Sequence, residues 1–146
     1  GLANVFPKRY RRLNFTDESL PASPTDVPAI SGAFMLVRRE AIKHVGPMDE
    51  AYFLHGEDLD WCRRFRDAGY KIVFVPHARL THHQGTCGRT MPIHVEWHKH
   101  RGMWRYYRKF QAAQAGRLLN AAVASGIAVH FAARATQLTL RRRAAS

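Results

Sequence analysis

Cysteine and acidic residues are both scarce in this chain. It has 2 cysteines among 146 residues, too few for the disulfide framework of a small secreted domain, so we expect a reducing compartment. Only 11 Asp and Glu residues stand against 23 Lys and Arg, which gives a formal net charge of +12. Anionic partners are therefore favoured: nucleic acid, an acidic membrane surface or phosphorylated small molecules.

The N-terminus lacks both a methionine and a basic-then-apolar signal segment. Its stretch "NFTDESLPASPTDVP" is instead rich in turn-forming Pro, Ser, Thr and Asp. We therefore expect residues 1–29 to be a loop-rich segment, and we interpret the chain as a piece of a longer protein.

Long apolar runs are also missing. The stretch "LLNAAVASGIAVHFAARA" falls short of the ~20 residues that span a bilayer, and it carries Asn120, Ser125 and His130. Together with "HVEWHKHRGMWRYYRKF" before it, it predicts basic, aromatic and amphipathic helices over residues 93–146. These helices either lie on an anionic membrane surface or pack on the domain as ordinary helices.

Residues 30–92 show alternating strand and helix signals. The run "SGAFMLVRR" is typical of a buried strand, and "REAIKHVG" of a short helix closed by Gly46. The loop "PMDEAYFLHG" leads to a helix over residues 57–68, and "YKIVFVP" predicts a strand. The apolar stripe of that helix consists of Leu59, Cys62, Phe65 and Ala68. This order of elements predicts an α/β fold.

Three carboxylates, Glu57, Asp58 and Asp60, gather at the start of the 57–68 helix. Acids favour helix N-termini on structural grounds alone, because unpaired N–H groups and the helix dipole stabilise negative charge there. The same placement holds a carboxylate rigidly beside a cleft, where it can take a proton from a hydroxyl as general base. The residues alone leave both interpretations open.

Two adjacent histidines, His82 and His83, follow the second predicted strand. Neighbouring side chains on an extended chain point to opposite sides, so at most one of them faces a given site. One imidazole can complete an oxygen-rich metal site but cannot build one, and a lone histidine is more often simply hydrogen-bonded.

These pieces together resemble the C-terminal half of the catalytic domain of family-two glycosyltransferases, in the branch that includes bacterial rhamnosyltransferases. In order, the matching pieces are "SGA", "MLVRREA", "VGPMDEAYFLHGEDLDWCRR", "AGYKIVFVP" and "HH". They cover residues 30–85, and the likeness continues more weakly through "HRGMWRYYRKF". The resemblance implies a partial GT-A-type, Rossmann-like domain without its N-terminal nucleotide-binding half, whose acceptor side is residues 30–92.

The resemblance also implies roles for the acids and the histidine. Asp58 would be the base that deprotonates the acceptor hydroxyl, and Glu57 would orient the acceptor. His82, chosen over His83 for its spacing from Asp58, would join Mg²⁺ or Mn²⁺ at the sugar-nucleotide diphosphate.

The remaining expected site residues bind donor or acceptor. Gly32 and Ala33 would let the backbone approach the sugars closely, and Asp60 lies beside the acidic pair. Arg89 and Arg101 would contact a diphosphate.

The implied reaction is an inverting, non-processive transfer of a sugar, with rhamnose favoured, from a nucleotide-diphosphate donor to a cell-surface glycan or lipid-linked acceptor. We expect it in the cytoplasm, peripheral to the inner face of the plasma membrane. The family's Asp-x-Asp metal motif does not precede Ile30, and the Gln-x-x-Arg-Trp motif of processive members is missing. The chain is therefore expected to be inactive alone.

Two rival interpretations concern the basic and histidine-rich region. A zinc-binding module would use Cys87, His94, His98 and His100, but no Cys-x-x-Cys pair accompanies them. A nucleic-acid-binding module would use the interleaved bases and aromatics of "HKHRGMWRYYRKF". No nucleic-acid fold signature accompanies that stretch, so we expect no nucleic-acid partner.

Overall fold

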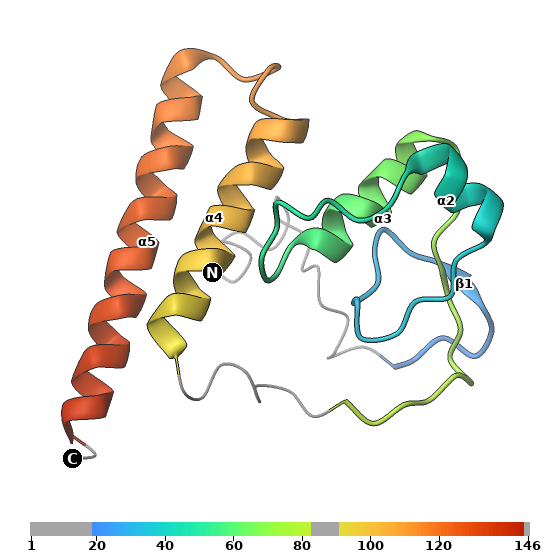
Figure 1. Ribbon diagram of the computed structural model, residues 1–146, viewed down its shortest axis with the longest axis horizontal. Helices are drawn as coiled ribbons and strands as arrows, with labels where there is room; N and C mark the ends of the chain where they lie inside the picture. Colours follow the sequence, from blue (N-terminus) through green and yellow to red (C-terminus); the bar gives the residue numbers. More distant parts are fainter. Residues whose placement is uncertain (1–18, 83–90, 145–146) are drawn as a thin grey trace.

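The computed structural model describes residues 19–82 and 91–144 of the chain (Figure 1). Its elements, in order, are β1 (Thr25–Asp26), α2 (Arg39–Val45), α3 (Glu57–Asp67), β2 (Val73–Phe74), α4 (Pro92–Phe110) and α5 (Arg117–Ala144). Helices α2 and α3 and the two strands form one unit, and α4 stands between this unit and α5 (Figure 1). The described residues are thus richer in helix than the α/β prediction implied.

The two short helices end where their glycines predict. Gly46 closes α2 in a left-handed conformation, with φ 87°, and its N–H donates to the carbonyl of Ile42 at 2.7 Å. Gly69, with φ 84°, follows α3 in the same way. The helix predictions for both segments are confirmed, and so is the helix predicted in the basic, aromatic stretch, which is α4.

The sheet within the described residues has two strands. β1 and β2 pair antiparallel, with Thr25 opposite Phe74, and the Val27 N–H extends the pairing by donating to the Ile72 carbonyl at 2.8 Å. The strand predicted in "YKIVFVP" is confirmed over Val73–Phe74. Its partner comes from residues 1–29, which were expected to be loop.

The buried strand expected over "SGAFMLVRR" is wrong for this structure. Residues 31–37 are irregular, and the side chains of Phe34 and Leu36 are 59% and 93% exposed. A strand requires a neighbour that accepts and donates its backbone hydrogen bonds, and no described segment pairs with this one. Without a pairing partner this apolar run forms no strand, although Met35 and Val37 still pack against the core.

The core lies between α2, α3 and the sheet. Trp61, Cys62 and Phe65 of α3 pack with Ala41 and Ile72, all of them buried. The Trp61 indole N–H donates to the Gly46 carbonyl at 2.9 Å, which ties α3 to the end of α2. The stripe predicted for α3 is therefore only half right: Cys62 and Phe65 are buried, but Leu59 is 40% exposed and Ala68 is exposed.

Helices α4 and α5 form an antiparallel pair. The Tyr107 hydroxyl donates to Asn120 Oδ1 at 2.6 Å, and the Asn120 amide donates to the Ala112 carbonyl at 3.1 Å, which closes the turn between them. Further along, His100 Nε2 and His130 Nδ1 lie 2.8 Å apart across the pair. Asn120, which the sequence presents as an interruption of the apolar run, thus has a structural use.

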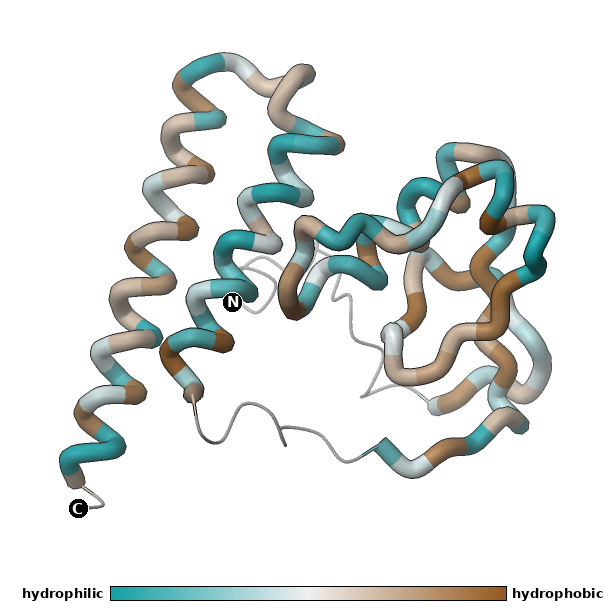
Figure 2. Tube along the Cα trace, in the orientation of Figure 1, coloured by the Kyte–Doolittle hydropathy of each residue, from teal (hydrophilic) through white to brown (hydrophobic). Residues whose placement is uncertain are grey.

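Helix α5 is longer than its apolar core predicted. It runs for 28 residues with a mean hydropathy of 1.3 in its most apolar window, so its length and composition suffice to cross a membrane. None of that window is buried within the described residues, and apolar residues recur along the helix (Figure 2). The expectation that this stretch is too short to span a bilayer is therefore corrected.

Candidate functional site

The acidic pair is presented by a tight turn that leads into α3. His55 has φ 67° and Gly56 has φ 97°, so two consecutive residues are left-handed just before Glu57. This conformation is unusual for a residue with a Cβ, and it is often found where a functional site requires a sharp change of chain direction. A Cβ on Gly56 would lie 3.3 Å from the Tyr52 ring, so this position also lacks room for a side chain.

Asp58 joins this turn to the irregular segment that was expected to be a strand. Its Oδ2 accepts a hydrogen bond from the Gly32 N–H at 2.9 Å, and its Oδ1 accepts one from the Leu59 N–H at 2.8 Å. The side chain is half-buried, and each oxygen keeps a second lone pair. The structure thus brings together two predicted site residues that lie 26 positions apart, Gly32 and Asp58. Ala33, beside them, is exposed.

Glu57 carries a buried oxygen without a hydrogen-bond partner. Its Oε2 is shielded from solvent, and no described residue donates to it. Such atoms are rare in folded proteins, and each calls for an explanation, such as a bound group that supplies the missing donor. A substrate hydroxyl beside Asp58 would be a donor of this kind.

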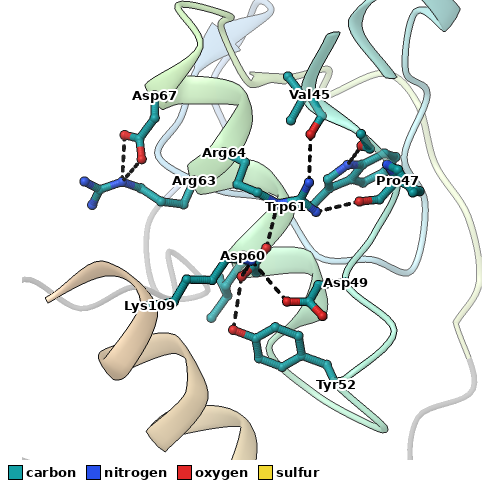
Figure 3. A network of polar contacts seen from close by, with 12 residues as sticks. Val45, Pro47, Asp49, Tyr52, Asp60, Trp61, Arg63, Arg64, Asp67 and Lys109 are labelled. Carbon is teal, nitrogen blue, oxygen red and sulfur yellow. Dashed lines mark hydrogen bonds and ion pairs between the residues drawn. The ribbon is translucent and has the colours of Figure 1, made fainter. Parts of the chain in front are cut away.

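Asp60 does not face the same way as its neighbours. It is 0% exposed, and its carboxylate contacts the Arg64 guanidinium at 2.8 Å, the Lys109 ammonium at 2.7 Å and the Tyr52 hydroxyl at 3.1 Å (Figure 3). Burial, together with the nearby Asp60 charge, raises the pKa of Tyr52 above its usual range. The expected contact of Asp60 with donor or acceptor therefore does not fit this geometry. Asp60 is a positioning residue that connects α3, the turn and α4.

Asp49 makes a second link to α4 from the loop "PMDEAYFLHG", residues 47–56, which is called the acidic loop below. Both of its oxygens meet the Arg105 guanidinium, at 2.8 and 2.9 Å, and Lys109 reaches Oδ2 at 3.1 Å. Burial alone would raise the pKa of Asp49, but the hydrogen bonds from Arg105 and Lys109 outweigh it and lower the pKa to about 2. Sequence reasoning missed this link; a signal for it exists in the i, i+4 spacing of Arg105 and Lys109 on a predicted helix.

Helix α4 also meets the turn through its backbone. A Cβ on Gly102 would lie 2.6 Å from the His55 carbonyl oxygen, a separation that real Cβ atoms do not tolerate. Only glycine at this position lets α4 approach the turn so closely. The turn at His55 and Gly56 that leads into Glu57 and Asp58, called the acid-bearing turn below, is therefore fixed in two ways. It is covalently continuous with α3, and α4 packs against it and its loop through Gly102, Arg105 and Lys109.

The expected metal ligand lies apart from these contacts. His82 is exposed, and in residues 19–82 and 91–144 no group of three or more His, Cys, Asp or Glu side chains is arranged to hold a metal ion. One imidazole does not make a divalent-cation site, so the described residues do not fit such a site on their own. His83 and Arg89 lie outside the described residues.

The histidines expected to bind zinc do not form a metal site among the described residues. His94 and His98 share a face of α4, with their Nε2 atoms 3.1 Å apart, but His100 turns away to the Glu96 carbonyl and to His130. Desolvation, and then the charges of His94 and Arg101, lower the pKa of His98. Cys87 lies outside the described residues.

Arg101 lies on another side of α4, exposed to solvent. It lines a groove of about 300 Å³ between α4 and α5 whose other lining residues are mostly apolar. Its predicted role at a diphosphate stays a prediction, as do the roles of Glu57, Asp58, Gly32 and Ala33.

Known proteins resemble this chain over most of its length. A family model described as glycosyltransferase-like family 2 matches residues 4–106. The N-acetylglucosaminyl-diphospho-decaprenol L-rhamnosyltransferase of Mycobacterium tuberculosis is 34% identical over 115 residues, which are 71% of this chain and 38% of that protein. Rhamnosyltransferase WbbL of Escherichia coli is 38% identical over 42% of this chain and 23% of its own. The dTDP-rhamnosyl transferase RfbF of Shigella flexneri is 32% identical over 50% of this chain and 24% of its own.

The chain spans less than two fifths of the length of these curated relatives. No solved structure matches it. The family match includes β1, the acid-bearing turn, α3 and most of α4, and it ends before α5 begins. Since that match extends over more than half of the residues, the chain belongs to glycosyltransferase-like family 2.

Proposed function

We propose that this chain forms the acceptor side of an inverting, non-processive glycosyltransferase. The transferred sugar is rhamnose, carried by a nucleotide diphosphate, and the acceptor is a sugar linked to a lipid diphosphate. The names of the similar rhamnosyltransferases support this choice of substrates. The nucleotide-binding half would be supplied by residues outside the described ones.

The observation that carries the proposal is the anchored carboxylate of Asp58 beside the unpartnered oxygen of Glu57. Asp58 is fixed by the N–H groups of Gly32 and Leu59, and each of its oxygens keeps a free lone pair for an acceptor hydroxyl. Glu57 Oε2 offers an acceptor for a second hydroxyl of the same sugar. Together they hold an acceptor with one hydroxyl against a base.

The reaction then needs one proton transfer and one displacement. Asp58 takes the proton from the acceptor hydroxyl as its oxygen forms the new bond to the anomeric carbon of the donor. The bond from that carbon to the diphosphate oxygen breaks on the opposite face, and the nucleoside diphosphate leaves with the electron pair. The configuration inverts, and no covalent enzyme intermediate forms. The Mg²⁺ or Mn²⁺ expected from the family resemblance would draw its ligands from outside the described residues, which make no metal site of their own.

Transfer by the full-length polypeptide that carries this chain tests the base assignment. Asp58→Asn keeps an oxygen for the Gly32 N–H but loses basicity, so we expect an intact fold and a kcat lower by about 10²- to 10⁴-fold. Asp67→Asn, which changes an exposed acid of the same helix, is the matched control and should be nearly neutral. Near-normal turnover by Asp58→Asn would refute the assignment.

We further propose that α5 places this enzyme on the inner face of the plasma membrane. Its exposed apolar side chains include Leu118, Leu119, Val129 and Leu140, and Arg141, Arg142 and Arg143 follow them at the end of the helix. Apolar burial and attraction to anionic lipid act together in such a helix. Cosedimentation with vesicles should be stronger for anionic than for neutral lipid, and equal partition into both would remove the electrostatic part of the proposal.

The nucleic-acid alternative is weakened because two of the bases of α4 are paired within the molecule. Arg105 and Lys109 are engaged with Asp49 and Asp60, and so they are not arrayed along an open face. Charge that is paired inside the molecule contributes little to phosphate binding.

A further inference from the structure

The groove between α4 and α5 is lined almost entirely by apolar side chains. Its lining includes three aromatic residues, Trp97, Trp104 and Phe131, and three aliphatic residues of α5, Ala124, Ile127 and Ala128. The groove has a volume of about 300 Å³. At roughly 30 Å³ for each non-hydrogen atom, the volume of one water molecule in the liquid, it accommodates about ten such atoms, or about two isoprene units. An apolar groove of this size suits a hydrocarbon chain better than a sugar or a nucleotide.

One cation stands at this groove. Arg101 lines it and is exposed, and Arg is suited to bidentate contact with phosphate oxygens. A chain that carries a diphosphate at one end therefore matches the site in both shape and charge.

The position of Arg101 on α4 gives the direction in which such a ligand would lie. With 3.6 residues per turn, Trp97 and Trp104 face the groove, whereas Gly102 and Arg105 face the acid-bearing turn, about a third of a turn away. Arg101 lies between these two sides. A ligand with its hydrocarbon tail in the groove and its diphosphate on Arg101 would extend toward the turn that carries Glu57 and Asp58.

We propose that the α4–α5 groove binds the isoprenoid tail of a lipid-diphosphate acceptor and that Arg101 binds the acceptor's diphosphate. This rests on the proposed function for the identity of the sugar, but the tail site itself does not depend on turnover. Arg101 is thereby assigned to the acceptor's diphosphate and not to that of the nucleotide. The most apolar part of α5, none of which is buried among the described residues, would lead the tail from a bilayer to the groove.

Binding of farnesyl diphosphate to the 146-residue chain tests the proposal, with inorganic pyrophosphate and farnesol as head-only and tail-only probes. Tryptophan fluorescence reports on the groove, because Trp97 and Trp104 line it, whereas Trp61 is 8% exposed in the core. We expect farnesyl diphosphate to bind about tenfold more tightly than either partial probe.

Two variants separate tail from head. Ala128→Leu fills the groove and should weaken both farnesyl diphosphate and farnesol by about tenfold, whereas Ala133→Leu, on an exposed position outside the lining, should not. Arg101→Gln should reduce the affinity for farnesyl diphosphate to that for farnesol. Arg108→Gln removes an exposed arginine of the same helix that does not line the groove and should change little. Circular dichroism checks that each variant folds.

Three results would overturn the proposal: farnesyl diphosphate affinity unchanged by Ala128→Leu, equal effects of the two arginine variants, or pyrophosphate binding as tight as that of farnesyl diphosphate. A dimer in sedimentation that Ala128→Leu dissociates, with no farnesyl diphosphate binding, would assign the groove to a second copy of the chain instead. Asp58→Asn should leave this binding unchanged. A full-length enzyme that needs Asp58 for transfer, in a chain that binds no farnesyl diphosphate, would therefore refute the groove and leave the proposed function standing.

Discussion

Asp60 is the residue whose loss should cost this structure most. It is fully buried, and its carboxylate meets Arg64 at 2.8 Å, Lys109 at 2.7 Å and the Tyr52 hydroxyl at 3.1 Å. Asp60→Ala leaves two cations and a hydroxyl without their acceptor. Removing one partner of a buried ion pair typically costs about 3–5 kcal/mol. Because the side chains of Arg64 and Lys109 are 20% and 33% exposed and can turn toward water, we expect the lower end, about 3 kcal/mol.

Urea unfolding, followed by circular dichroism and by tryptophan fluorescence, measures this loss. With an m-value of about 1–3 kcal/mol/M, the midpoint should fall by about 1–3 M. Asp67→Ala is the control on the same helix: its ion pair with Arg63 is about half exposed, so its loss should cost about 0.5 kcal/mol or less. Asp60→Asn keeps an acceptor for Tyr52 and should fall between the two. If Asp60→Ala unfolds at the same urea concentration as Asp67→Ala, the network does not stabilise the fold as argued.

Two further predictions concern the contact between the acidic loop and α4. The folded pKa of Asp49, about 2, lies below its ordinary 3.8, so its contribution is fully present above pH ~4 and is lost as the pH falls from about 4 to 2. The shift alone corresponds to about 2.5 kcal/mol, which we discount to about 1 kcal/mol because Arg105 is 42% exposed and its charge is screened. The difference in urea midpoint between the wild type and Asp49→Asn should therefore shrink between pH 6 and about pH 2.5; a constant difference would contradict the assignment. Gly102→Ala places a Cβ 2.6 Å from the His55 carbonyl oxygen and should lower the thermal midpoint, whereas Gly126→Ala, with nothing within 4 Å on α5, should stabilise by up to about 1 kcal/mol. A rise in both midpoints would show that α4 does not dock on the turn.

The helices were predictable because their signals are local. Gly46 and Gly69 mark the ends of α2 and α3, and Pro92 starts α4, all within one turn of the residues they affect. The strand over Val73–Phe74 was also predicted, but its pairing was not, because pairing depends on segments far apart. Thr25 of the turn-rich N-terminal stretch pairs with Phe74, while the more strand-like run at residues 31–37 has no partner among the described residues. Strand propensity indicates which segment can pair, and not which one does.

The predictions for the candidate site also succeeded where the signal was local and failed where it depended on residues far apart in the sequence. That Glu57 and Asp58 stand at a helix start followed from their position alone, since carboxylates are favoured there. The resemblance to the family placed Asp58 and Gly32 in the same site, but their contact was not predicted, because nothing in the spacing of these residues indicates that they meet. The link from Asp49 to Arg105 joins residues 56 positions apart, and the prediction missed it.

The error in the predicted buried face of α3 shows why Asp60 differs from Glu57 and Asp58. A three-residue apolar step predicted one buried stripe, through Cys62 and Phe65, with charged residues on the wet side. In the structure α3 is buried on a second side as well, because Lys109 of α4 reaches Asp60 at 2.7 Å. An unpaired carboxylate is strongly disfavoured in a protein interior, so a sequence pattern places Asp60 outside unless its cations are known. One of those cations is a turn away, at Arg64, and the other is on a helix that begins 32 residues later, at Pro92. The same acidic motif can therefore present Glu57 and Asp58 to a substrate while its third acid holds the turn against α4, and only the position of α4 distinguishes the two roles.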